Sequence, residues 1–219
     1  MKNTIIFLLG LLPVTAAHAQ KTYFAAHGAL QNTWIFCSDD SDAGGLLDYL
    51  PTYKPAFGLD FGYQFQPQLA LQTGILYSLQ GQRYETAGNV NARYRTNLEY
   101  LKFPLLLHFT ASPERKLSFQ AQAGFQLSWL TKAESSRLNV FGYYSPALVD
   151  VKSYYSTLPL DLVVGLGLQM KVRSYIVGLM LRMDYALTDI EKSDKKTGLR
   201  GPASNFTLSM PQLGVKYYF

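Results

Sequence analysis

Apolar and polar residues alternate with a period of two along most of this chain. In the clearest stretch, from Leu117 to Trp129, Leu, Phe, Ala and Trp occupy one face while Gln, Ser and Gly occupy the other. A period of two indicates a β-strand whose two faces meet different surroundings. A barrel wall in a membrane provides such surroundings, because one face meets lipid and the other faces the lumen.

The same alternation recurs along the chain and predicts eight strands. It is weak at 23–33 and clear at 57–65, 69–77, 101–109, 117–129, 160–168, 177–183 and 212–219. Short connections at 66–67, 112–116 and 171–174 alternate with long polar segments at 37–55, 81–97, 131–157 and 188–204. This layout predicts an all-β fold, an eight-stranded antiparallel up-and-down transmembrane β-barrel with short periplasmic turns and long extracellular loops.

Aromatic residues on the outward face are expected at the two membrane interfaces, where a ring can lie between lipid and water. The strand directions place one set at the periplasmic end and another at the extracellular end. The periplasmic set is Phe65, Phe109, Phe119, Tyr175, Tyr217 and Phe219, and the extracellular set is Tyr77, Trp129, Tyr155, Tyr185 and Phe206. One residue disturbs the pattern: Pro104 lies in mid-strand, where we expect a β-bulge.

The N-terminus has the features of a secretory signal peptide. Lys2 precedes an apolar segment at 5–14, and Ala17-His18-Ala19 forms a small-residue cleavage site. The apolar segment is shorter than the roughly 20 residues that a transmembrane helix needs. We therefore expect residues 1–19 to be cleaved and residues 20–219 to form the barrel domain, which is exported to the outer membrane.

Composition supports a membrane barrel over a soluble domain. Charged residues make up 16% of the chain, against about 25% in a typical soluble domain. The basic residues are dispersed, so we expect no nucleic-acid partner. Cys37 is the single cysteine, which excludes an intramolecular disulfide and a cysteine-based metal cluster. We expect outer-membrane lipid to surround the protein.

Charged residues on the predicted inward faces form the candidate site. They comprise three acids and three bases, which are Asp60, Asp161, Asp184, Lys102, Arg182 and Lys216. An eight-stranded barrel is just wide enough for side chains to fill it, and buried charges are tolerated when they are paired. A plugged lumen held by ion pairs is therefore favoured over a narrow path for ions or protons.

The sequence contains no catalytic signature. His108 is predicted to face inward near the periplasmic end, with His27 as a possible neighbour, and an ordinary hydrogen-bonded histidine is favoured over a catalytic one. The chain lacks a G-x-S-x-G nucleophile elbow. Glycines on the inward face have no phosphate-loop spacing and are expected to make room for bulky neighbours. We expect no enzymatic activity, no catalytic residues, no metal and no cofactor.

Four segments resemble the PorT-type outer-membrane β-barrel family of Bacteroidota. They are 100–108 (YLKFPLLLH), 162–168 (LVVGLGL), 181–189 (LRMDYALTD) and 213–219 (LGVKYYF). The resemblance extends over essentially the whole chain after the signal segment and implies a barrel in the outer membrane. The family includes the secretion-associated PorT protein and many members without an assigned activity, so it supplies no catalytic motif.

The leading hypothesis is therefore a structural or protein-interaction component of the cell envelope. Its candidate partners are other envelope or secretion proteins. The alternative is a narrow pore for ions or small solutes, and a lipid-modifying enzyme is the third hypothesis.

Overall fold

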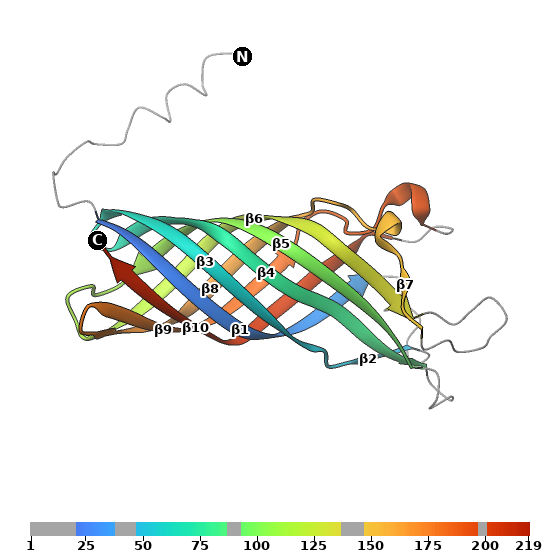
Figure 1. The fold of residues 1–219 in the computed structure, drawn as a ribbon, viewed down its shortest axis with the longest axis horizontal. Helices are drawn as coiled ribbons and strands as arrows, with labels where there is room; N and C mark the ends of the chain where they lie inside the picture. Colours follow the sequence, from blue (N-terminus) through green and yellow to red (C-terminus); the bar gives the residue numbers. More distant parts are fainter. Residues whose placement is uncertain (1–20, 38–46, 87–92, 137–146, 197–200) are drawn as a thin grey trace, which may run out of the picture.

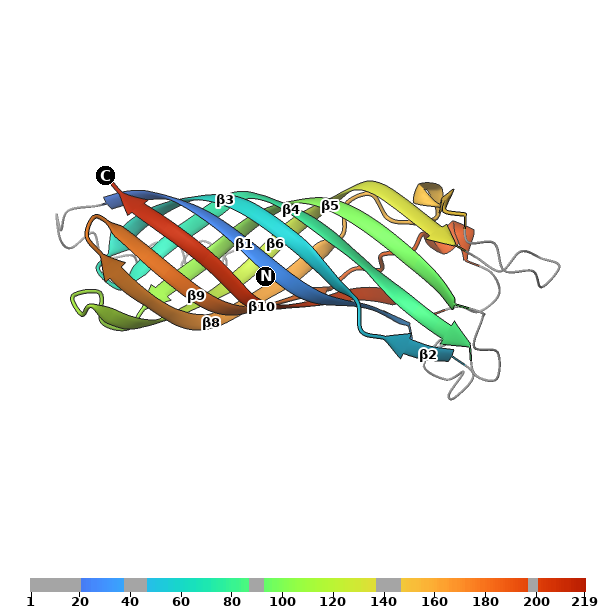
Figure 2. The ribbon, with the colours of Figure 1, turned by 60° about the horizontal axis from the view of Figure 1, so that its bottom comes forward.

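Eight long strands close into an antiparallel barrel in the computed structural model (Figure 1). The structure describes residues 21–37, 47–86, 93–136, 147–196 and 201–219. The predicted signal segment, 1–19, lies outside the described residues, as do parts of the four long connections. Both ends of the described chain lie at the end of the barrel that carries the short turns (Figures 1 and 2).

Each long strand pairs with its sequence neighbours among the long strands, and the first pairs with the last. The long strands are β1 (Lys21–Cys37), β3 (Tyr53–Gln66), β4 (Leu69–Thr86), β5 (Arg93–Thr110), β6 (Leu117–Ser136), β8 (Leu160–Val172), β9 (Tyr175–Ala186) and β10 (Ala203–Tyr218). Pairing of β1 with β10 closes the barrel. The predicted up-and-down topology is confirmed.

Short elements lie at the end with the long connections. Strand β2 (Leu47–Leu50) pairs with β4, and strand β7 (Val149–Asp150) pairs with β6. Two single-turn 3₁₀ helices, η3 (Lys152–Tyr154) and η4 (Ser193–Lys195), follow. No helix among the described residues is long and apolar enough to cross a membrane.

The outward face carries an apolar band and the inward face is mostly polar. Outward Phe57, Leu59, Leu105 and Leu166 are exposed, as lipid-facing side chains are in the isolated protein. Inward glycines leave room for large neighbours. A Cβ on Gly62 would lie 2.0 Å from Cζ of Tyr23, so only glycine lets that buried ring cross the lumen at this level.

The strands extend further than the alternation of apolar residues predicted. Residues 81–86 and 131–136 were expected in loops but continue β4 and β6. A tilted transmembrane strand needs about 9–11 residues, and β6 has 20. Beyond Trp129 the outward side chains become polar, such as Lys132, while inward Leu130 and Ala133 are apolar and buried. This inverted pattern is typical of a β-sheet in water, so this part of the barrel extends above the lipid.

The prediction of a β-bulge at Pro104 is wrong. Pairing of β5 with β6 runs through Pro104 opposite Gln126 without a shift, and the bulge on this pair lies at Glu99/Tyr100. The backbone position at which Pro104 lacks an N–H instead faces β4. There the pairing of β4 with β5 is interrupted between the pairs Thr73/Leu105 and Leu76/Lys102. The hydroxyl of Thr73 donates to the Pro104 carbonyl at 2.9 Å, which replaces part of the interrupted ladder.

Outward aromatic rings gather at both ends of the apolar band. At the end with the short turns, Tyr217 lies 5.1 Å from Phe219 and 5.5 Å from Tyr175, measured between ring centroids. At the other end Phe206 lies 5.3 Å from Trp34. The expectation for Tyr155 is wrong, because this side chain packs against the buried apolar cluster. Tyr155 lies between η3 and β8, so strand alternation does not apply to it.

Candidate functional site in the barrel lumen

Four of the six predicted lumen charges meet in one cluster, here called the upper ion cluster. Lys102 of β5 places its Nζ 3.3 Å from Asp161 Oδ2 of β8 and 3.2 Å from Asp184 Oδ2 of β9. Arg182, two residues before Asp184 on the same inward face, places its Nε 2.8 Å from Asp184 Oδ1. Two bases and two acids leave the cluster formally neutral.

Polar neighbours complete the hydrogen bonding of the upper ion cluster. The amide of Gln126 donates to both Asp161 and Asp184 at 2.9 Å, and its carbonyl accepts from Arg182 Nη2 at 2.6 Å. The Ser128 hydroxyl donates to Asp161 at 2.6 Å. Strand register explains this arrangement, because Gln126 lies directly opposite Asp161 and Ser128 lies opposite Lys102. The cluster therefore spans the lumen between β5, β6, β8 and β9.

The other two predicted charges lie nearer the short turns and pair with histidines. His27 Nδ1 of β1 lies 2.9 Å from Asp60 Oδ2 of β3, within ion-pair distance but without hydrogen-bond geometry. Lys216 Nζ of β10 lies 2.8 Å from His108 Nε2 of β5. Gln120 contacts the same His108 nitrogen at 3.2 Å. The sequence singled out both histidines but did not predict that each would join a different charged residue.

A small cavity connects these two histidine pairs. Its volume is about 30 Å³ and its lining includes His27, Asp60, His108 and Lys216. One water molecule needs about 10–15 Å³ of such space, so the cavity can hold about two. Gln122 Nε2, on the same lining, is buried without a hydrogen-bond partner in the described part of the chain. Internal water suits this polar pocket.

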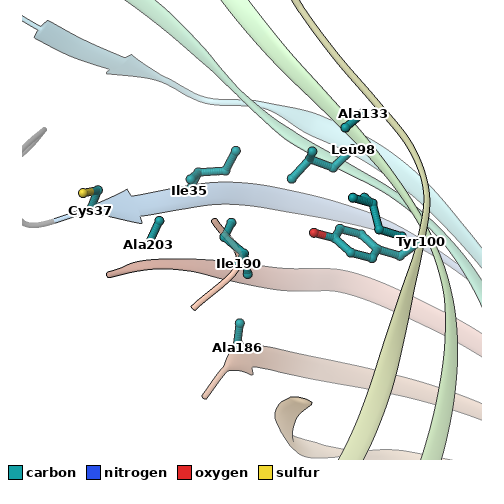
Figure 3. Packing of buried hydrophobic residues seen from close by; sticks show 9 residues of the cluster. Ile35, Cys37, Leu98, Tyr100, Ala133, Ala186, Ile190 and Ala203 are labelled. Carbon is teal, nitrogen blue, oxygen red and sulfur yellow. The ribbon is translucent and has the colours of Figure 1, made fainter. Parts of the chain in front are cut away.

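A cluster of buried apolar residues lies inside the barrel on the far side of the upper ion cluster, and we call it the apolar seal. Ile35, Leu98, Tyr100 and Ile190 converge there from different parts of the chain (Figure 3). All members are buried, and the remaining ones are Cys37, Leu130, Ala133, Ala186 and Ala203. No member of the seal is charged, and its nearest polar neighbours are neutral: Gln80 lies opposite Leu98, and Asn205 donates to the Tyr100 hydroxyl.

The inward row of β5 presents these layers in order. From the extracellular side it carries Tyr100 in the seal, Lys102 in the upper ion cluster, buried Leu106, and then His108. Each of the six predicted charged residues is at most 9% exposed. Along β5 the lumen therefore consists of successive apolar and ionic layers, and buried Gln, Ser and Thr side chains lie beside them.

Asp189 organises the loop that holds Ile190 in the seal. Its carboxylate accepts hydrogen bonds at 3.0 Å from the backbone amides of Glu191 and Ala203, and Lys196 Nζ contacts its other oxygen. Burial opposes ionisation of Asp189, but the hydrogen bonds from Lys196, Ala203 and Glu191 outweigh it and hold the pKa of this carboxyl below its ordinary value. Sequence alternation did not indicate this residue, because it lies after the end of β9.

The loop around Asp189 is expected to loosen in acid. A lowered pKa means that Asp189 stabilises the fold fully above the unfolded value of about 3.9, and that this contribution is lost as pH falls below it. Amide hydrogen exchange of Ala203, corrected for intrinsic rates, should show less protection at pH 3 than at pH 6. Asp189→Asn should have low protection at both values, whereas Asp194→Asn, at an exposed site in η4, should behave as the unmodified protein. Equal protection of the unmodified protein at both pH values would contradict the assignment.

These features define an integral β-barrel of the outer-membrane class, with an apolar outer band and a filled polar lumen. A family model described as the outer membrane protein beta-barrel domain matches residues 27–192. The chain belongs to this family. Family membership supports the predicted location in the outer membrane. A search of curated proteins finds no match.

Solved structures with a similar fold come from several bacteria. OprG from Pseudomonas aeruginosa is 12% identical, with 91% of this chain and 97% of that chain covered and a TM-score of 0.49. Neisserial surface protein A is also 12% identical, with 90% and 97% covered and a TM-score of 0.47. The outer membrane protease OmpT from Escherichia coli is 10% identical, with 95% and 99% covered and a TM-score of 0.43. Likeness at this level concerns the fold alone.

Proposed function

We propose that this chain is a plugged, non-conducting barrel in the outer membrane. It anchors an extracellular β-sheet extension, which is formed by the strand segments 81–86 and 131–136 together with β2 and β7. This extension contacts other envelope proteins. The apolar seal carries this proposal, because it places buried apolar side chains inside the barrel at the level where the strands leave the lipid. The upper ion cluster supports it, since its two bases are paired with its two acids. The proposal assigns no catalytic activity and no cofactor.

The proposal extends to the finer family assignment. Membership of the PorT-type group of Bacteroidota, and with it an association with secretion, rests on the four resembling segments at 100–108, 162–168, 181–189 and 213–219. Export by a cleaved signal peptide at 1–19 belongs to the same proposal. N-terminal sequencing of the mature protein from outer membranes tests the cleavage, and a start at Gln20 is the expected result.

Conductance in planar bilayers tests whether the lumen is closed. The refolded protein should give no stable current steps under conditions in which a reference porin conducts, because the seal excludes hydrated ions. Stable steps from the unmodified protein would contradict the plugged barrel and favour the narrow pore. A drop in those steps on substitution within the upper ion cluster would place the conducting path in the lumen.

Crosslinking in intact cells tests the interaction role. Val149 of β7 is 61% exposed on the extension, whereas Leu59 of β3 is 68% exposed on the lipid-facing band. A photoreactive residue at position 149 should capture envelope proteins, and the same residue at position 59 should capture lipid. Capture of lipid alone at both positions would contradict a protein partner for this face of the extension.

A further inference from the structure

A cavity lies at the end of the barrel with the short turns, and we call it the vestibule. It has a volume of about 460 Å³ and is open on one side. Thr110, Gln169, Ile176 and Tyr218 lie along its walls as inward-facing residues near the ends of their strands. In outer-membrane barrels this end faces the periplasm. Buried His108 and Lys216 lie two residues further in than Thr110 and Tyr218 on the same strands, so packed side chains lie behind the vestibule.

Positive charge gathers at the rim of the vestibule. Lys21, Lys171 and Arg173 line it, against a single acid, Glu114. Lys21 lies two residues before inward Tyr23, and Lys171 two residues after inward Gln169, so both lysines continue inward-facing rows. Within the described chain, none of the three bases has a carboxylate at ion-pair distance.

The absence of paired carboxylates distinguishes these three rim bases from the bases inside the lumen. Deeper in the lumen, Lys102 and Arg182 are matched by Asp161 and Asp184 within the upper ion cluster. The rim bases face water in a concave site with low-dielectric walls, which focuses their field and raises the local concentration of anions. The barrel therefore presents a positively charged pocket to one compartment.

The remaining lining is part apolar and part polar, and its uncharged polar members are Gln64, Gln66, Thr110, Gln169 and Ser174. Its apolar members include inward-facing Ile176 and Tyr218 and the turn residues Pro67 and Pro113. Small-molecule sites commonly have volumes of about 300–1,000 Å³, with apolar walls and a few polar anchors. The vestibule satisfies the size of such a site and offers apolar surface beside its polar groups. Its anchors are cationic, and lysine and arginine both bind phosphate and carboxylate groups through charge-assisted hydrogen bonds.

We propose that the vestibule binds a small organic anion from the periplasmic side, namely a phosphate ester or carboxylate attached to a compact apolar body. Lys21, Lys171 and Arg173 hold the anionic group, and Ile176, Tyr218 and the turn prolines contact the apolar part. The site is separate from the extracellular surface on which the proposed interaction role depends, so either one can fail without the other. The same phosphate chemistry occurs on a free molecule and on a lipid headgroup, and the experiment must separate these sources.

Phenyl phosphate is a suitable probe, because it joins a phosphate dianion to one aromatic ring. The refolded barrel in phosphatidylcholine nanodiscs is labelled at the isoleucine δ1 methyl groups. Among the described residues, Ile176 lies on the vestibule wall, Ile35 and Ile190 lie in the apolar seal, and Ile75 faces lipid. Titration should shift the Ile176 methyl signal saturably and leave Ile35 and Ile190 unchanged. Phenol, which lacks the phosphate, should bind at least about tenfold more weakly, as expected for loss of a charge-assisted contact.

Two charge variants make the assignment specific. Lys171→Gln with Arg173→Gln should raise the dissociation constant of phenyl phosphate by about tenfold or more. Arg115→Gln with Lys116→Gln removes the same charge from the neighbouring turn, at positions that do not line the vestibule, and should leave it within about twofold. Equal weakening by both pairs would show general electrostatic attraction and overturn the pocket. A linear, unsaturable shift of Ile176, or no shift, would also overturn it.

A second lipid composition identifies the source of the anion. The titration is repeated in nanodiscs that contain phosphatidylglycerol. A headgroup that occupies the vestibule would shift Ile176 before phenyl phosphate is added and would weaken its binding, and both effects should disappear in the Lys171→Gln, Arg173→Gln variant. An unchanged Ile176 signal, with unchanged phenyl phosphate affinity, assigns the pocket to a free periplasmic molecule. Either result supports the anion pocket, provided that saturable binding is seen in phosphatidylcholine.

Discussion

Replacing Arg182 with methionine is expected to lower the free energy of unfolding by about 3–5 kcal/mol, reduced where lumen water screens the site. The upper ion cluster is formally neutral, with Lys102 and Arg182 against Asp161 and Asp184. Methionine fills similar space but removes one positive charge and the hydrogen bonds to Asp184 and Gln126. The remaining lysine then faces two buried carboxylates.

The second substitution in this experiment follows from the charge count. Asp184→Asn in the Arg182→Met background restores neutrality between Lys102 and Asp161, so the double variant should recover part of the loss. Asp60→Asn is the matched control, because Asp60 lies in the other layer and pairs with His27. A double-mutant cycle on refolded protein in detergent should give a coupling energy for Arg182 with Asp184 and near-additivity for Arg182 with Asp60. Additive losses in both cycles would count against a packed ionic layer and favour a hydrated lumen.

Strand alternation was enough to predict the barrel, because lipid and lumen impose opposite demands on neighbouring residues. It also placed Lys102 and Arg182 on inward faces. It could not predict their partners, since cross-lumen contacts depend on the stagger between strands that are distant in sequence. Asp161 and Asp184 meet Lys102 only because the closed register of β5, β6, β8 and β9 brings three strands to one level.

The sequence analysis missed the features outside the lipid-spanning strands, because it assumed that each strand has one face in lipid and the other in the lumen. Beyond Trp129 the outer face meets water, so Lys132 points outward and Leu130 inward, and the segment reads as a polar loop. The apolar seal was missed for this reason. Ile190 and Asp189 lie outside any strand, so no period applied to them. The vestibule also escaped prediction, since Lys21 and Arg173 come together only when the barrel closes.

Arginine in place of Leu105 should destabilise the barrel by about 2–4 kcal/mol, the cost of a charged side chain at the middle of the lipid-facing wall. Outward positions on β5 run from Leu101 to Phe109, near the two aromatic ends, and Leu105 lies midway between them. Its side chain is 57% exposed in the isolated protein, so the cost arises from lipid and not from lost packing.

Val149→Arg is the matched control, because Val149 is 61% exposed on β7, above the lipid. We expect its cost to stay within about 0.5 kcal/mol, as at other surface positions. Denaturant unfolding in lipid vesicles measures both free energies. Vesicles are needed because the expected cost at position 105 arises from contact with lipid. Equal costs at the two positions would show that β5 is not lipid-facing at Leu105, and the boundary between the membrane band and the extension would then have to be redrawn.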